Sequence, residues 1–192
     1  RHREIWDIHR ALKGNLAGER AQAPFVVVSG SSGFGKTQIA LEYAFRFSAA
    51  YPGGVFRISG KEAEPAAQFS QLAVNAPLKP QILAILRQLC PETECSEKTS
   101  LLKIRAALAE QLAQREGDYL WIVDDLPEGI NGPVIQQWLA PEKADQSPKR
   151  AHNILISESQ RYDHRGDPIH LPLLSEVSGQ MILSGHRPPT RT

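Results

Sequence analysis

The sequence predicts an α/β fold, a parallel sheet with helices on both of its faces. Short apolar runs alternate along the chain with segments in which apolar residues recur at helical spacing. The run over residues 25–28 is continuously apolar and mostly β-branched, which is typical of a strand buried on both faces. A glycine-rich loop follows this strand at once and leads into a helical pattern, as in a βα unit.

The elements of the N-terminal half follow from this alternation. Apolar residues at helical spacing predict a helix over 3–13, which Gly14 can end. The buried strand over 25–28 comes next, and a second helix begins near Lys36. A short strand is predicted over 55–58, directly after a pair of glycines.

Two or three helices are predicted in the middle of the chain. One is expected over 65–74, although prolines interrupt this stretch. A second contains Pro80 in its first turn, where proline is tolerated, and its apolar face reaches Leu89. The next has its buried face between residues 101 and 112, and either Ser96 or Thr99 is expected to cap it.

The C-terminal part supplies the remaining strands. An apolar run predicts a strand over 119–123, and a short helix follows over 133–139. Further strands are expected over 153–156 and 169–171. The alternation therefore predicts five strands joined by helical crossovers, in one sheet.

Composition limits the classes of function. The chain has 192 residues, of which 41% are hydrophobic and 22% charged, as expected for one globular domain and not for a disordered chain. Lys and Arg number 22 against 21 Asp and Glu, so the net charge is +1 and we expect no direct nucleic-acid partner. Apolar stretches are short, so we also expect no membrane partner.

Residues 30–37 read Gly-Ser-Ser-Gly-Phe-Gly-Lys-Thr and fit the phosphate-binding pattern G-x-x-x-x-G-K-[ST]. The glycines let main-chain N–H groups surround a phosphate, and the following helix directs its positive end to the same place. Lys36 supplies a charge to the β and γ phosphates, and the Thr37 hydroxyl is a ligand for Mg²⁺. The candidate nucleotide-binding residues from this motif are Gly30, Ser31, Ser32, Gly33, Phe34, Gly35, Lys36 and Thr37.

Two adjacent acids, Asp124 and Asp125, end the strand over 119–123. A solvated strand end is the plain alternative, but a phosphate-binding loop upstream favours a catalytic interpretation. We expect Asp124 to hold Mg²⁺ with Thr37, largely through water. We expect Asp125 to polarise the water that attacks the γ-phosphate. The motifs therefore predict a three-layer P-loop NTPase that binds a nucleoside triphosphate with Mg²⁺.

The chain resembles the STAND class of P-loop ATPases, which contains the NB-ARC signalling domains, over about residues 1–183. Arg1-His2-Arg3-Glu4 is similar to the G-R-x-x-E element of that class, without its glycine. The other similar segments are 25–44, 53–58, 120–125 and 171–176. The resemblance adds Arg1, on the adenine side, and Gln38 to the candidate nucleotide-binding residues, and it makes Ser157 a polar sensor in catalysis.

The resemblance also implies a strand order of 2-3-4-1-5 and binding of ATP and ADP. It implies a cytoplasmic, nucleotide-gated switch that is closed with ADP, oligomeric with ATP and slow in hydrolysis. Effector and sensor domains would lie outside this segment, since the chain begins without Met. We expect an N-terminal helix and linker over 1–23, the NTPase domain over 24–183 and a tail over 184–192.

The sequence departs from that class after the fourth strand. Ser157-Glu158-Ser159 stands where the class has Thr-Thr/Ser-Arg, so the sensor arginine is missing and a carboxylate lies near the triphosphate. Arg161 or Arg165 could replace that arginine, or could be lid arginines of a small P-loop phosphotransferase, a nucleoside or metabolite kinase. A non-hydrolysing, nucleotide-dependent scaffold is a further alternative. An AAA-type loader acting on DNA comes last because the net charge is so small.

Overall fold

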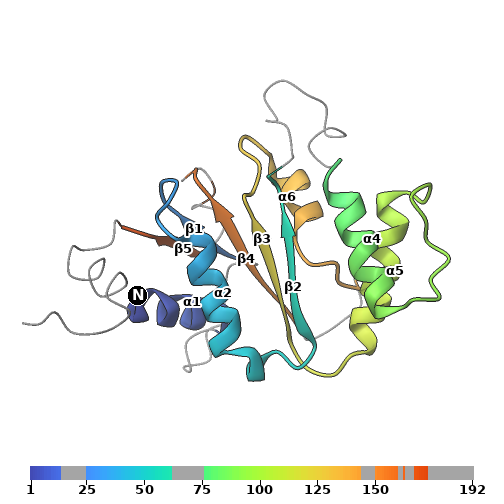
Figure 1. The fold of residues 1–192 in the computed structure, drawn as a ribbon, viewed down its shortest axis with the longest axis horizontal. Coiled ribbons are helices and arrows are strands. Elements are labelled where there is room, and N and C mark those ends of the chain that lie inside the picture. The colour runs from blue at the N-terminus through green and yellow to red at the C-terminus, as the bar shows by residue number, and fades with distance from the viewer. Residues whose placement is uncertain (14–24, 62–75, 144–149, 160–161, 163–166, 173–192) are drawn as a thin grey trace, which may run out of the picture.

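A five-stranded parallel sheet forms the centre of the computed structural model (Figure 1). The structure describes residues 1–13, 25–61, 76–143, 150–159, 162 and 167–172. The strands are β1 (Val26–Ser29), β2 (Gly54–Ser59), β3 (Tyr119–Asp124), β4 (Ala151–Ser157) and β5 (Asp167–His170). Their order across the sheet is β2-β3-β4-β1-β5 and each neighbouring pair is parallel, so the expected strand order is confirmed.

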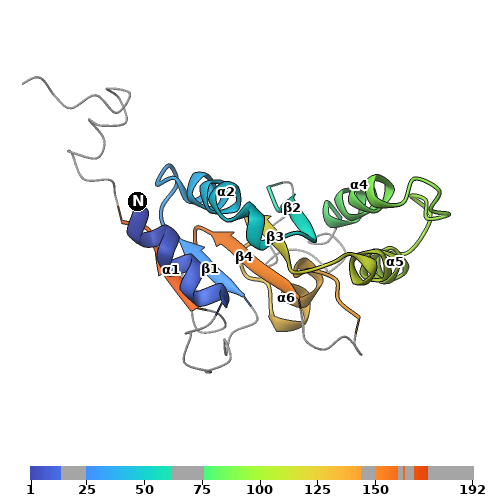
Figure 2. The ribbon, with the colours of Figure 1, turned by 90° about the horizontal axis from the view of Figure 1, so that it is seen from below.

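Helices cover both faces of this sheet, as predicted for three layers. They are α1 (His2–Lys13), α2 (Lys36–Arg46), α4 (Leu78–Leu89), α5 (Leu101–Gln114) and α6 (Gly132–Trp138), with a short 3-10 helix, η1 (Ser48–Ala50). Apolar residues of α1 and α2 form one core with the sheet, and those of α4, α5 and α6 form a second core on its other face. Figure 2 shows α4 and α5 side by side beyond β2, where the two helices pack against each other.

Residues of β3 illustrate the two-sided burial. Tyr119, Trp121 and Val123 belong to the core of α4, α5 and α6, whereas Leu120 and Ile122 belong to the core of α1 and α2. All six residues of this strand are buried, as the continuous apolar run predicts. Because successive side chains of a strand point to opposite faces of the sheet, β3 contributes apolar side chains to both cores.

The carboxyl ends of the strands meet at one edge of the sheet because the strands are parallel. Ser29 of β1 is in register with Ser157 of β4 and with His170 of β5. At the other side of the sheet, Ser59 of β2 is in register with Asp124 of β3. Polar residues from all five strands therefore end at the edge from which the glycine-rich loop departs.

Some details differ from the sequence predictions. The fifth predicted helix is capped by Ser100, whose hydroxyl accepts a hydrogen bond from the amide of Lys103, and not by Ser96 or Thr99. The Thr99 hydroxyl instead accepts from the amide of Ser96 in the turn before it. The helix expected over 65–74 and the tail over 184–192 lie outside the described residues. In the described part of the chain, no helix has the length and apolar character that crossing a membrane requires.

Candidate nucleotide-binding site

The glycine-rich loop joins β1 to α2, in the place that the motif predicts. Gly33 and Gly35 have φ angles of 77° and 81°, in the left-handed region that side chains other than glycine rarely adopt. A Cβ atom at either glycine would meet nothing within 4 Å, so the loop borders open space. The N-cap residue of α2 is Gly35, which supplies no side-chain cap to the amides of the first turn. The backbone is thus arranged as an anion cradle at a helix N-terminus.

Gly30 begins the loop and packs against Leu171, the residue that follows β5. Its φ angle is 152°, and a Cβ there would come within 3.0 Å of the carbonyl oxygen of Leu171. The amide of Leu171 donates to the carbonyl of Ser29, which extends the pairing of β5 with β1. Side chains larger than glycine are therefore disfavoured at position 30 by both conformation and space.

Lys36 lies at the first position of α2 and is buried, with 7% of its side chain exposed. Its ammonium group donates a hydrogen bond to the carbonyl of Ser31, 2.9 Å away, and so lies across the loop. The carboxylate of Glu158 is 3.7 Å from the same nitrogen. The charge predicted to bind phosphate thus lies against the carbonyl of Ser31 in the loop, near the acid that follows β4.

Thr37 and Asp124 meet, as expected of two residues that share a metal ion. The Thr37 hydroxyl donates to one carboxylate oxygen of Asp124 at 2.8 Å, and Asp124 is 2% exposed. The other carboxylate oxygen accepts from the guanidinium of Arg57, on β2, at 2.5 Å. Both oxygens of the buried acid therefore have a donor, which satisfies its charge.

Asp125 is placed differently from its neighbour. Its side chain is exposed, and its φ angle is 52°, a left-handed value that Asp adopts more readily than most residues. The carbonyl of Asp125 packs on Gly60, where a Cβ would come within 2.3 Å of it. The amide of Leu126 then donates to Ile156, so the chain is tied to β4 directly after the acid. This turn directs Asp125 outward at the same edge, and its role as base stays a prediction.

The remaining predicted residues lie at the same edge. Ser157 is buried, and its hydroxyl accepts from the amide of Ser159 at 3.0 Å. Arg1 donates to the carbonyl of Pro172 at 2.8 Å, next to the Leu171 carbonyl that packs on Gly30. The amide of Phe34 donates a hydrogen bond to the carbonyl of Ser31 within the loop. Ser32 and Gln38 are exposed. These placements are compatible with the predicted roles and do not test them.

Sequence reasoning missed Arg57. It stands in a short strand, and its contact with Asp124 depends on the register between β2 and β3, which no local pattern indicates. Arg161 and Arg165, the predicted substitutes for a sensor arginine, lie outside the described residues. His170 lies at the end of β5, and its Nδ1 is 2.7 Å from the hydroxyl of Ser29.

The chemistry of these donors fits a nucleoside triphosphate with Mg²⁺. The loop offers main-chain amides and the ammonium of Lys36 to phosphates, and Thr37 and Asp124 offer oxygen ligands, which Mg²⁺ prefers. Among the residues that the structure describes, no group of three His, Cys, Asp or Glu could hold a metal alone.

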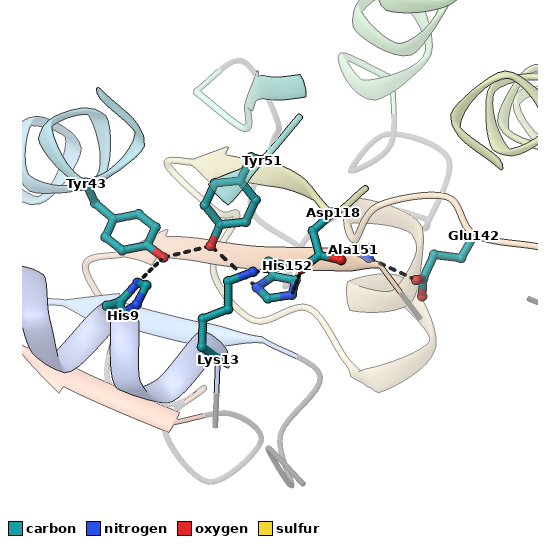
Figure 3. Close-up of polar contacts among 8 residues, drawn as sticks. All are labelled: His9, Lys13, Tyr43, Tyr51, Asp118, Glu142, Ala151 and His152. Atoms are coloured by element: carbon teal, nitrogen blue, oxygen red, sulfur yellow. Dashed lines mark hydrogen bonds and ion pairs between the residues drawn. The ribbon is translucent and has the colours of Figure 1, made fainter. Parts of the chain in front are cut away.

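A second polar cluster lies at the opposite end of the sheet, where the strands begin (Figure 3). We call it the amino-end cluster, and it comprises His9, Lys13, Tyr43, Tyr51, Asp118 and His152. The hydroxyls of Tyr43 and Tyr51 are 2.7 Å apart, and Tyr51 also lies 3.4 Å from Nδ1 of His152. Lys13, at the end of α1, forms an ion pair with Asp118 at 2.7 Å. The cluster thus connects α1 and α2 with the starts of β3 and β4.

Burial governs the ionisation of this cluster. Burial, together with the charge of nearby Lys13, lowers the pKa of His152 to about 4. It raises the pKa of Tyr43 to about 12, and it also raises the pKa of Tyr51. The pKa of His9 is lowered as well, by burial and by Lys13. Tyr43, Tyr51, His9 and His152 are therefore neutral at pH 7, and hydrogen bonds connect them.

Comparison with known proteins supports the fold. The structure is similar to the ORC1 protein of Aeropyrum pernix in complex with DNA, with a TM-score of 0.63 and 14% identity over 98% of this chain. It is also similar to Drosophila ORC bound to DNA, with a TM-score of 0.59 and 18% identity over 97% of this chain. This chain spans 50% and 45% of those two chains. No family model and no curated protein matches the sequence. The chain has the fold of a P-loop NTPase.

The comparison corrects one expectation. The small net charge led us to expect no direct nucleic-acid partner, and to rank a DNA-acting protein last. The two structures named above are complexes with DNA, so that expectation is wrong. Net charge sums over the whole chain, whereas contact with DNA depends on the charges of one surface.

Proposed function

We propose that this chain is an ATP- and ADP-binding module of the STAND type, in which the bound nucleotide gates oligomerisation and Mg²⁺-dependent hydrolysis is slow. The observation that carries the proposal is the meeting of Lys36, Thr37 and Asp124 at one edge of the sheet. The loop amides and Lys36 bind the phosphates, and Arg1 lies on the adenine side. In this proposal the NTPase domain spans residues 24–183 and the protein is cytoplasmic.

Slow hydrolysis follows from what surrounds Lys36. The carboxylate of Glu158 stands 3.7 Å from the ammonium group, where it opposes the approach of a γ-phosphate. Ser159 occupies the position of the sensor arginine, so that position lacks a charge to stabilise the transferring phosphoryl group. Asp125 is left as the residue that would orient and deprotonate water.

Nucleotide binding is the first test. Fluorescent ATP and ADP analogues are titrated into the wild type and Lys36→Ala, with Mg²⁺ and with chelator. We expect Lys36→Ala to weaken ATP binding at least 30-fold, because the full charge among the phosphates is lost. Arg46→Ala removes an exposed arginine at the end of α2, where it pairs with Glu42, and should bind as the wild type does. Equal binding by Lys36→Ala and wild type would contradict the proposal.

The switch and the hydrolysis are tested separately. Sedimentation velocity with ATP and with ADP should show larger species only with ATP; identical profiles would exclude gating of this chain. Asp125→Asn should abolish release of phosphate while ATP affinity stays within twofold of wild type. Turnover that is unchanged in Asp125→Asn would show that Asp125 is not the base.

Two alternatives remain open to experiment. A small P-loop phosphotransferase would yield a phosphorylated nucleoside or metabolite faster than it releases phosphate to water. A non-hydrolysing scaffold would bind ATP through Lys36 and release no phosphate above the rate of the Lys36→Ala variant.

A DNA partner is a second candidate function, and the observation that favours it is the fold shared with two DNA-bound proteins. Fluorescence anisotropy with a labelled duplex, with and without ATP, tests it. Binding through phosphate contacts should weaken steeply as salt increases. No change in anisotropy at micromolar protein and low salt would exclude it for this chain.

A further inference from the structure

The acid predicted to hold Mg²⁺ is engaged by an arginine. Asp124 is 2% exposed, and its two oxygens accept from Thr37 and from Arg57. Mg²⁺ and a guanidinium are both cations that require the same carboxylate charge. They cannot occupy that place together without repelling each other across a short distance.

The architecture explains how Arg57 reaches Asp124. Phe56 and Ile58 of β2 face the core of α4, α5 and α6, so the residue between them points to the opposite face. Asp124 alternates with Val123 in the same way and lies on that face too, next to the start of α2. Among the described strands β2 is at the edge of the sheet and β3 is its neighbour, so the long side chain of Arg57 reaches Asp124 over this face.

The two side chains of the pair differ in exposure. The Asp124 side chain is 2% exposed, whereas 47% of the Arg57 side chain is exposed. A long, half-exposed arginine can leave its partner by rotating its side-chain bonds, at small cost to the fold. The guanidinium can therefore be displaced while the rest of the site keeps its geometry.

We propose that Arg57 competes with Mg²⁺ for the carboxylate of Asp124. Nucleotide affinity should then depend little on Mg²⁺ at concentrations too low for the metal to displace the guanidinium. The inference rests on the proposed function and adds a residue that sets metal dependence. Without Mg²⁺, Arg57 neutralises Asp124 and so prevents that buried carboxylate from repelling the phosphates. With Mg²⁺, the metal must first replace an existing ion pair.

The test is a titration of Mg²⁺ at a fixed concentration of a fluorescent ADP or ATP analogue, read as binding and not as turnover. In Arg57→Ala we expect the half-saturating Mg²⁺ concentration to fall at least fivefold. We also expect the ratio of the dissociation constants in chelator and in Mg²⁺ to rise at least tenfold. Arg57→Lys keeps the charge and should lie closer to wild type. Arg46→Ala, also a partly exposed arginine paired with an acid, is the matched control and should not change either value.

Failure of this inference is distinct from failure of the proposed function. If nucleotide binding requires Lys36 but Arg57→Ala and wild type give the same Mg²⁺ titration, Arg57 does not compete with the metal. If Arg57→Ala needs more Mg²⁺ than wild type, Arg57 assists the metal and the inference is overturned. If no Lys36-dependent binding occurs at all, the proposed function itself fails. Circular dichroism verifies that each variant is folded.

Discussion

The two ends of the sheet carry polar clusters of different character. At the carboxyl end, Lys36 and Asp124 are buried, and each meets an oppositely charged side chain that is about half exposed, Glu158 and Arg57. At the amino end, two buried tyrosines and two partly buried histidines are neutral and joined by hydrogen bonds. The buried carboxyl-end groups are paired with half-exposed partners, whereas the hydroxyls of Tyr43 and Tyr51 are paired with each other inside the protein.

Because of this difference, we expect the two ends of the sheet to affect different properties, nucleotide affinity at one end and the free energy of unfolding at the other. A ligand can replace an exposed partner of Lys36 or Asp124 without disturbing the core, because the partner returns to water. No such exchange is open to Tyr43 or Tyr51, since each hydroxyl is buried and would lose its partner. Changes at the amino end should therefore alter the free energy of unfolding, and changes at the carboxyl end should alter nucleotide affinity.

The strongest effect is expected from acid at the amino-end cluster. The pKa of His152 is about 4 in the folded protein and 6.5 in the unfolded chain, so the unfolded chain binds more protons between these values. The contribution of His152 to the free energy of unfolding is therefore fully present above pH 6.5 and falls by about 3 kcal/mol as the pH decreases to 4. Urea unfolding at a series of pH values measures it.

The variant His152→Gln removes this titration and should flatten the decline between pH 6.5 and 4. His2 is exposed, so His2→Gln is the control and should decline as the wild type does. The assignment to His152 is wrong if His152→Gln and wild type lose stability in parallel over that range.

A smaller loss of stability is expected from Tyr43→Phe. The change removes a hydroxyl that lies 2.7 Å from Tyr51 and 3.3 Å from Nδ1 of His9, and all of Tyr43 is buried. We expect about 1–2 kcal/mol of destabilisation, since a buried donor loses its partner. Urea unfolding and nucleotide titration should show lower stability with ATP affinity within twofold of wild type. A large loss of affinity would show that the two ends are coupled.

The smallest effect is expected at Glu158. Because its carboxylate is 3.7 Å from the Lys36 ammonium and 55% exposed, Glu158→Gln should raise ATP affinity about threefold, within the range of exposed charge pairs. Unfolding should change little. Glu42→Gln makes the same charge change at a partly exposed residue of α2 that pairs with Arg46, and it serves as the control. Equal affinity for Glu158→Gln and wild type would place Glu158 outside the binding site.

The glycine-rich loop could be predicted from the sequence because its chemistry is local. Residues 30–37 are contiguous, and the strand before them and the helix after them have strong patterns. Asp124 was predicted for the same reason, since it directly follows a buried strand. The strand order came from the resemblance to a family and not from the periodicity of the chain.

Contacts between distant segments could not be predicted in this way. Arg57 meets Asp124 across 67 positions of sequence, and Lys13 meets Asp118 across 105. Such contacts depend on strand register and on how α1 packs, which follow from the whole core. The N-cap of α5 could not be predicted either. Ser96, Thr99 and Ser100 are all suitable cap residues, and the backbone conformation selects Ser100.

The most direct test of the account is an amide chemical-shift map by NMR as ATP and Mg²⁺ are added. The account predicts that the amides of Gly33, Gly35 and Lys36 shift strongly, while those of Tyr51 and His152 at the other end of the sheet do not. The Lys36→Ala variant should lose these shifts. Saturating ATP that leaves Gly33 and Gly35 unchanged, or that shifts the amino-end cluster instead, would contradict the assignment of this edge as the nucleotide site.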